Sequence, residues 1–365
     1  MKIRQVPTYA VSVLAAACLS AHALDTASAE HVSLPKSVAP ALLTVKPPRE
    51  PKSNHFHISE AKLAQLPKPE QPPQLRDALL DLQNRSIEER VEKLKAKALA
   101  DLVYVQGGSF MRGDFAKLMD VPGVTRMTYN EDDKVVREIK LSDFWISRYK
   151  TTYAEFDVFT DATKRPRTGM DSDGENRHPL VPAGAYWQEA KDYCLWLGKI
   201  TGQRFDLPTE AQWEYAARSR GQFFMIATDD GNIEFGRNVP YAAQADQLSP
   251  LKKFVLPYPV GLFPPTPIGL HDMAHDGQEW VNDWYSIDAY AKAKAKASDP
   301  KGPTSGNKKV NRGWSQWDSL KIGVNVWRRS DKPVPTNSHL DGSTEKEVKI
   351  GTSWAPSMRC VATSP

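Results

Sequence analysis

The sequence predicts one main α+β domain, rich in loops, over residues 101–365. The segment 187–200 repeats apolar residues with the 3.6-residue period of an amphipathic helix, and the segment 208–218 begins with the helix N-cap residue Thr209. The other apolar runs in this part of the chain are short and have the length of strands. Glycine and proline separate these runs, which indicates turns and loops between short elements.

The composition favours a soluble globular protein that does not bind nucleic acid. Hydrophobic residues make up 40% of the chain and charged residues 25%, as in ordinary globular domains. The formal net charge of +4 comes without a long basic stripe, so we expect no nucleic-acid partner. Beyond the leader described next, no stretch is apolar enough to cross a bilayer, and we expect no transmembrane segment.

Residues 1–23 have the pattern of an export signal. Two basic residues precede an apolar run over 9–19, which is too short to span a bilayer, and an Ala-His-Ala cleavage site follows. We therefore expect cleavage after Ala23 and a periplasmic protein. The alternative is a lipoprotein anchored through Cys18, because LAAAC loosely resembles a lipoprotein box, although Ala15 stands where a larger aliphatic residue is usual.

Two segments are expected between the leader and the main domain. Residues 24–74 are polar and rich in proline, a composition that favours an extended linker. In residues 75–100 apolar side chains recur at helical spacing, and Ser86 and Glu89 match a capping box. We expect two short helices that meet near Asn84 and form a helical stalk ahead of the domain.

Within the domain, the first elements are predicted from local signals. Apolar strands at 102–105 and 110–112 flank a Gly-Gly pair, which predicts a β-hairpin. The amphipathic pattern predicts a helix over 187–200. A second helix over 208–218 has Thr209 as its N-cap. After this helix we expect mostly loops.

Three cysteines limit the thiol chemistry: Cys18, Cys194 and Cys360. Cleavage of the leader leaves the last two, an even number that suits a disulfide in an oxidising compartment. Two independent buried thiols are the alternative. Their wide separation in sequence excludes a metal-binding Cys-x-x-Cys motif.

Five segments in order carry a recognisable pattern: LVYVQGGSFMRG (102–113), FWISRYKTTYAEF (144–156), LPTEAQWEYAAR (207–218), GLHDMAHDGQEWVNDWY (269–285), and VNRGWSQWDS with SMRCVAT (310–319 and 357–363). Together they resemble the formylglycine-generating enzyme family, also called the sulfatase-modifying-factor domain. The resemblance implies that family's fold, a relative of C-type-lectin-like scaffolds whose long loops tolerate variation. It also implies a disulfide between Cys194 and Cys360, which secreted members of the family contain.

The family's aerobic enzymes oxidise a sulfatase cysteine with copper and oxygen, and two thiolates five residues apart hold the copper. Soft thiolates suit Cu(I), but the matching positions here are Asp318 and Gly323. The resemblance therefore implies no copper and no formylglycine-generating chemistry. The pocket serine of the family is kept as Ser315, Gln278 replaces a pocket tryptophan, and the usual Glu-Val-Thr appears as Lys150-Thr151-Thr152.

The resemblance also implies a structural calcium ion in the loop GLHDMAHDGQEW. The side chains of Asp272 and Glu279 and the carbonyls of His275 and Gly277 would supply the hard oxygen ligands that calcium prefers. The alternative is a turn that aspartate hydrogen bonds hold without a metal.

No catalytic residue is assigned, but a candidate pocket consists of Trp314, Ser315, Trp317, Asp318, Arg328 and Gln278. With Trp327 and Arg329 these side chains could line a groove for a polar or aromatic ligand, in which a carboxylate near arginines acts as an acid or base. They could equally form a salt-bridged structural segment with core tryptophans.

Two functions follow from these observations. The first is a non-catalytic periplasmic recognition module whose partner is an envelope protein, for example as an accessory or immunity partner of an envelope or secretion-system protein. The alternative is a periplasmic oxidoreductase of the pyoverdine-maturation type, acting on a small molecule or peptide. Stoichiometric iron or copper would favour the second.

Overall fold

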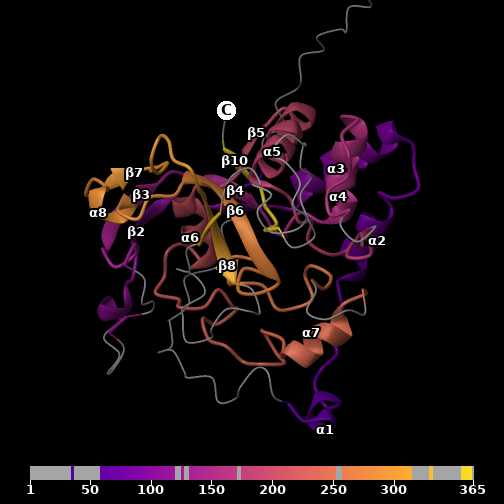
Figure 1. The fold of residues 1–365 in the computed structure, drawn as a ribbon, viewed down its shortest axis with the longest axis horizontal. Coiled ribbons are helices and arrows are strands. Elements are labelled where there is room, and N and C mark those ends of the chain that lie inside the picture. The colour runs from indigo at the N-terminus through magenta and orange to yellow at the C-terminus, as the bar shows by residue number, and fades with distance from the viewer. Residues whose placement is uncertain are drawn as a thin grey trace, which may run out of the picture. The chain divides into compact units, whose positions relative to one another are not determined.

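The computed structural model describes residues 34–36, 58–119, 125–126, 131–170, 174–251, 257–314, 329–331 and 355–363. The chain divides into two compact units, Met1–Val32 and Ser33–Pro365, and every described residue belongs to the second. This unit mixes helices and short strands, so the predicted α+β class is confirmed (Figure 1). None of the described helices combines the length and the apolar character that crossing a membrane requires.

The elements follow one another in an irregular order. The helices are α1 (Glu60–Leu63), α2 (Pro73–Leu80), α3 (Ile87–Ala100), α4 (Tyr153–Ala162), α5 (Trp187–Thr201), α6 (Glu210–Ala217), α7 (Ala242–Leu248) and α8 (Ala289–Lys292), with a 3₁₀ turn at Ala116–Leu118. The strands are β1 (Leu102–Val105), β2 (Gly108–Arg112), β3 (Arg137–Leu141), β4 (Phe144–Ser147), β5 (Arg204–Asp206), β6 (Gly277–Trp284), β7 (Ala297–Ser298), β8 (Lys309–Trp314), β9 (Arg329–Asp331) and β10 (Val361–Thr363).

The strands of the described residues form three small open sheets. The central sheet has the order β1-β4-β10-β5 with antiparallel neighbours. The second sheet has the order β2-β3-β7, and the third the order β6-β8-β9. The central sheet joins the beginning of the domain to its end, because β10 lies between β4 and β5.

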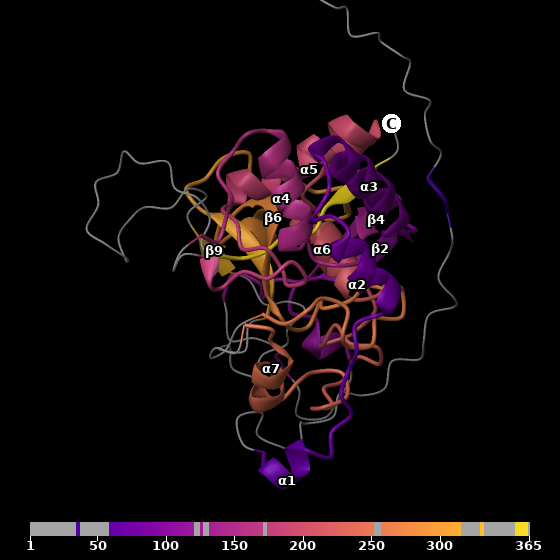
Figure 2. The ribbon, with the colours of Figure 1, turned by 90° about the vertical axis from the view of Figure 1, so that its right-hand side faces the viewer.

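Both faces of the central sheet are buried. Successive side chains of a strand point to opposite faces, so Val103 and Ile146 enter one hydrophobic core while Tyr104 and Trp145 enter another. The core that contains Trp145 also takes side chains from α3, α4 and α5, which lie together against the sheet (Figure 2). The core on the other face includes residues of α6. This burial explains why the strands are short, apolar runs.

The predicted β-hairpin at the start of the domain is wrong, although both of its strands exist. β1 pairs with β4 in the central sheet, whereas β2 pairs with β3 in the second sheet. The chain bends between β1 and β2 at Gly107, and it bends again between β3 and β4. A Cβ atom on Gly107 would lie 2.3 Å from the carbonyl oxygen of Leu141, so glycine lets the two bends meet.

The predicted helices at 75–100 exist, but they are part of the domain instead of a separate stalk. Ser86 and Glu89 form the expected capping box at the start of α3. Leu79 and Leu94 are completely buried in the same core as α4 and α5. Arg90 also donates to Asp161 of α4 at 2.7 Å. An amphipathic helix must bury its apolar face, and here the domain covers it.

Parts of the expected proline-rich linker also contact the domain. The indole of Trp145 donates to the carbonyl of Pro35 at 2.9 Å. The side-chain amide of Gln71 donates to the carbonyl of Val260, also at 2.9 Å. The described residues of this segment are therefore packed against the domain at these points.

The two helices predicted over 187–200 and 208–218 are confirmed. The helix expected over 187–200 is α5, and the helix expected over 208–218 is α6, with Thr209 accepting a hydrogen bond from Gln212 at its N-terminus. The region after α6 contains more regular structure than expected. The strands β6 and β8 lie there and pair along much of their length.

The structure contains the disulfide between Cys194 and Cys360, the pairing that the resemblance implies. Its Cα atoms are 5.6 Å apart, and the two cysteines are separated by 166 positions in the sequence. Cys194 belongs to α5 and Cys360 directly precedes β10. The bond therefore attaches helix α5 to the start of β10, an inner strand of the central sheet.

Reduction of this disulfide should lower stability without changing the fold. In the chain-entropy model a cross-link over a loop of this size stabilises by at most ~5 kcal/mol, and loss of a native disulfide commonly costs about 2–5 kcal/mol. Urea unfolding of the wild type and of Cys194→Ser measures the difference. Thiol labelling of both Cys194 and Cys360 in unreduced, denatured protein would contradict the pairing.

Candidate functional site

The pairing of β6 with β8 brings two residues of the predicted pocket close together. In this antiparallel pair Gln278 lies opposite Gly313, and Gly277 lies opposite Trp314. Gln278 is half-buried, and its carbonyl accepts hydrogen bonds from the backbone and side chain of Ser357 at 2.9 and 3.2 Å. The backbone at Gln278 therefore has β8 on one side and Ser357 on the other.

The remaining predicted pocket residues, Ser315, Trp317, Asp318, Trp327 and Arg328, lie outside the described residues, as does Gly323. The residues that flank this segment, Trp314 and Arg329, are among the described residues. Residues 315–328 follow Trp314 at the end of β8 and precede Arg329 at the beginning of β9. Because β9 pairs with β8 through Arg329 and Asn311, the segment begins and ends on the same sheet.

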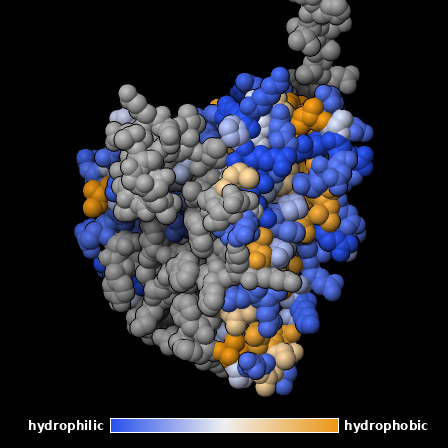
Figure 3. Space-filling view, turned by 45° about the vertical axis from the view of Figure 1, so that its right-hand side comes forward, coloured by the Kyte–Doolittle hydropathy of each residue, from blue (hydrophilic) through white to orange (hydrophobic). Residues whose placement is uncertain are grey.

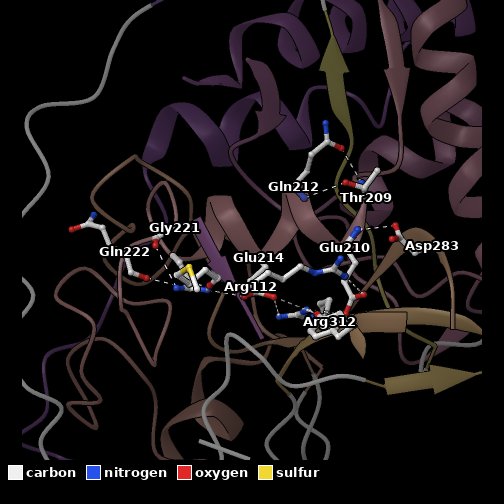
Figure 4. Close-up of polar contacts among 12 residues, drawn as sticks. Arg112, Thr209, Glu210, Gln212, Glu214, Gly221, Gln222, Asp283 and Arg312 are labelled. Carbon is white, nitrogen blue, oxygen red and sulfur yellow. Dashed lines mark hydrogen bonds and ion pairs between the residues drawn. The ribbon is translucent and has the colours of Figure 1, made fainter. Parts of the chain in front are cut away.

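A buried network of charges connects this sheet to helix α6 (Figure 4). Arg312 of β8 donates to Glu210 at 2.9 Å and to Glu214 at 3.2 Å. Arg112 of β2 donates to Glu210 at 2.5 Å, and Arg218 donates to Glu214 at 2.7 Å. Each side chain in the network is almost completely shielded from solvent. Such ions are tolerated in a protein interior only with close partners of opposite charge.

A carboxylate of β6 lies against the first turn of α6. Asp283 of β6 accepts a hydrogen bond from the backbone amide of Glu210 at 2.8 Å, and Thr209 and Gln212 form a capping box (Figure 4). Amide groups at a helix N-terminus favour a negative charge. The negative charge of Asp283 also helps to raise the pKa of Arg112, so this carboxylate supports the cations of the network.

Burial and ion pairing act in opposite directions on these arginines. Burial lowers the pKa of Arg218 to about 10, and Glu214 partly offsets this effect. Burial also works against the charge of Arg112, but Tyr290 and Glu210 outweigh it and raise the pKa of that group. The arginines therefore stay protonated at neutral pH, and the network acts as a fixed structural element.

A second buried ion pair holds the other end of β6. Arg359 donates to both oxygens of Glu279, at 2.6 and 2.9 Å, a bidentate geometry typical of strong arginine–carboxylate pairs. The indole of Trp213 donates to the same carboxylate at 3.2 Å. Arg359 also donates to the carbonyls of Ser147 and Arg148. Glu279 is thus already paired with groups of the protein.

The loop for which the resemblance implies calcium surrounds a lysine side chain. The ammonium group of Lys150 donates to the carbonyls of His275 and Asp276 at 2.8 Å and to that of Gly277 at 2.6 Å. Asp272 accepts from the amide of Gly261 at 2.8 Å. Burial lowers the pKa of the His275 imidazole to about 4, so that ring is neutral at neutral pH.

The described residues contain no group of three or more His, Cys, Asp or Glu side chains that could hold a metal ion. The calcium site of the sequence analysis uses two carboxylates and two carbonyls, and it stays a prediction. Its four ligands do lie in one region, because Glu279 and Gly277 are in β6 and the others directly precede that strand. The described geometry shows Lys150 bound to two of the four ligand groups.

A groove of about 670 Å³ lies between the segment 63–70 and α7, lined by Leu63, Ala64, Leu66, Pro67, Lys68, Pro69, Glu70, Gln244, Gln247 and Leu248. On the face shown in Figure 3, hydrophobic side chains gather at the lower edge, in the region of α1 and α7. The ionisable residues of the lining are Lys68 and Glu70, and the lining contains no serine, cysteine, histidine or pair of carboxylates. It is therefore a surface feature without recognisable catalytic groups.

Sequence reasoning missed the roles of Lys150, Arg112 and Arg312. The signals were present: Lys150 departs from the family's glutamate, and Glu210 and Glu214 are spaced one helical turn apart. Two carboxylates on the buried face of a helix require cations from elsewhere. The partners could not be chosen from sequence, because Arg112 and Arg312 are about 100 positions away from the helix.

Small open sheets, joined by long connections and covered by helices, make up the fold of this domain. The family model described as "Sulfatase-modifying factor enzyme 1-like domain" matches residues 88–356. The chain therefore belongs to this family. The match begins within α3, which agrees with the packing of that helix against the domain.

Several relatives have known names. The serine/threonine-protein kinase pkn1 of Chlamydia caviae is 29% identical over 279 residues, which is 73% of this chain and 41% of the kinase. The chain thus spans about two fifths of that protein. The formylglycine-generating enzyme of Mus musculus is 28% identical over 60% of this chain and 58% of the enzyme. The corresponding enzyme of Streptomyces coelicolor is 33% identical over 42% of this chain and 46% of the enzyme.

Solved structures agree on the fold. PvdO from Pseudomonas aeruginosa superimposes with a TM-score of 0.51 and 22% identity, over 72% of this chain and 93% of that one. Treponema denticola variable protein 1 does so with a TM-score of 0.50 and 15% identity, over 72% and 95%. At these identities the likeness concerns the fold alone.

Replacement of Arg312 should be far more damaging than replacement of an exposed arginine. Arg312→Met leaves Glu210 and Glu214 with one fewer cation in a buried site, and breaking such a pair costs about 3–5 kcal/mol. Arg237→Met is the matched control, because this arginine is partly exposed and pairs with Asp229 and Glu234. Exposed pairs contribute less than about 1 kcal/mol.

Urea unfolding measures both variants against the wild type. Equal stability losses in Arg312→Met and Arg237→Met would show that the buried network does not hold the domain together.

Proposed function

We propose that this member of the family is an exported binding module that does not generate formylglycine. Residues 315–328 would contact a protein partner in the cell envelope. The claim that the protein does not generate formylglycine rests on the state of its cysteines. The chain has three, and Cys194 and Cys360 are bonded to each other.

Copper-dependent oxidation in this family requires two thiolates close together. The disulfide leaves Cys18 as the one cysteine outside the bond, and Cys18 lies in the expected leader. The aligned positions Asp318 and Gly323 carry no sulfur. Carboxylates are hard ligands, whereas Cu(I) prefers soft ones. The residues present therefore do not fit the copper site of the family's oxidases.

The claim that residues 315–328 contact a partner rests on how the two ends of this segment are attached to the sheet. Its two ends are neighbours on the sheet β6-β8-β9, and Arg312, two residues before β8 ends, belongs to the buried network of α6. Recognition residues are often carried by loops on a rigid scaffold. The segment contains Trp317, Trp327 and Arg328, and tryptophan and arginine most often carry binding energy at interfaces.

The disulfide also supports the export that the leader suggests. Stable disulfides form in oxidising compartments such as the bacterial periplasm and are rare in the cytosol. An envelope partner is the proposal that fits this location.

The first test concerns chemistry. We expect no formylglycine when the copper-loaded protein is incubated with oxygen and a sulfatase-derived cysteine peptide. Mass spectrometry of the peptide measures the conversion, and the formylglycine-generating enzyme of Streptomyces coelicolor serves as the positive control. Conversion by this protein above the level of copper alone would refute the proposal's chemical half.

The second test concerns binding. We expect Trp317→Ala to capture its partner from envelope extract of the source organism at least tenfold less well, because a buried tryptophan anchor is worth 2 kcal/mol or more, which corresponds to roughly 30-fold. Ile287→Ala is the control, since Ile287 is an exposed hydrophobic residue outside the segment. Quantitative mass spectrometry compares the captured proteins.

Melting temperatures of the variants must match the wild type for this comparison to hold. Normal capture by both Trp317→Ala and Asp318→Ala would reject the segment as the contact surface. Stoichiometric iron or copper in the purified protein would instead support an oxidoreductase.

A further inference from the structure

The ammonium group of Lys150 is fully satisfied by one loop. It has three N–H donors, and the carbonyls of His275, Asp276 and Gly277 accept them within 2.8 Å. The side chain of Lys150 has no exposed area, and its nitrogen lies 3.9 Å from Glu279. Burial lowers the pKa of Lys150 against the opposing charge of Glu279, but three carbonyl acceptors require the three N–H donors of the protonated amine. Three converging carbonyls and a nearby carboxylate thus form a cation site, and Lys150 is the cation within it.

This arrangement competes directly with a calcium ion. Calcium requires six to eight oxygen ligands at about 2.3–2.6 Å. Lys150 already holds the carbonyls of His275 and Gly277, Arg359 holds both oxygens of Glu279, and a positive ammonium group would repel a divalent ion. The ligand set that the resemblance implies for calcium therefore does not fit a metal in this chain.

The backbone around Lys150 is hydrogen-bonded to the same loop on one side and to Met358 on the other. The amide of His271 donates to the carbonyl of Arg148 at 3.0 Å, and the rings of Tyr149 and His271 stack with their centroids 4.9 Å apart. On the other side, the amide of Thr151 donates to the carbonyl of Met358 at 2.8 Å. The lysine thus enters the loop from a backbone that is hydrogen-bonded on both sides.

We propose that the Lys150 ammonium group is the structural cation of the 269–280 loop, and that it takes the place of calcium. The position lies between β4 and α4, so one side chain attaches the start of α4 to the beginning of β6. A covalently attached cation is present in every folded molecule. The loop therefore keeps its conformation whatever the calcium concentration.

The first experiment uses the wild-type protein. We expect the same melting temperature, within about 1 °C, in EDTA and in millimolar CaCl₂, and no heat of calcium binding by titration calorimetry. A stoichiometric calcium site, or a melting temperature that falls in EDTA, would overturn the proposal. This measurement needs no variant and therefore does not depend on whether a variant folds.

The second experiment removes or reverses the charge. Lys150→Met should lower the melting temperature by roughly 10 °C, because three buried carbonyls and Glu279 lose their cation. Lys140→Met is the control, since Lys140 is an exposed lysine on β3, and it should melt within about 2 °C of the wild type. Equal melting of the two variants would contradict the role of Lys150.

Lys150→Glu distinguishes replacement of a metal from an ordinary hydrogen-bonding role. This variant frees the three carbonyls and adds a carboxylate, a set of oxygen ligands that suits calcium. We expect it to be unstable in EDTA and to melt several degrees higher in CaCl₂, whereas Lys140→Glu does not respond. A folded Lys150→Glu protein without a calcium response would reject the cation replacement.

Discussion

The pairing of buried carboxylates with buried arginines is the constraint on which the rest of this domain depends. Glu210 and Glu214 of α6 are shielded from water, and an unpaired carboxylate in such a place costs several kcal/mol. Their cations come from β2, from β8 and from the end of α6 itself. Each of these segments must be positioned before the charges balance, so the network connects parts of the chain that lie in different sheets.

The same requirement appears at the loop before β6. A domain with so many irregular segments has many backbone carbonyls that no helix or sheet can pair, and buried carbonyls need donors. Arg359 and Lys150 supply them: Arg359 donates to carbonyls of the β4 end, and Lys150 to those of residues 275–277. Long cationic side chains thus act as internal supports, and the loops can be ordered without regular secondary structure.

Local sequence signals predicted local structure well and strand pairing poorly. The helices α5 and α6, the capping box at Ser86 and the N-cap Thr209 depend on neighbouring residues, so periodicity and cap residues were sufficient to find them. The hairpin failed because partner choice depends on the bend at Gly107 and on β10, which lies near the other end of the chain. β6 was missed because its sequence contains more polar residues than an apolar strand pattern requires.

The sequence by itself determined the family, through five ordered motifs, and it shows that no two of its three cysteines stand five residues apart. It also determined the helices α5 and α6, since helical periodicity and caps act within a few residues. The tertiary structure decided which cation meets each buried acceptor. Lys150 and the carbonyl of His275 are 125 positions apart, and no local pattern relates them. Their contact exists because burial forces distant polar groups to satisfy one another.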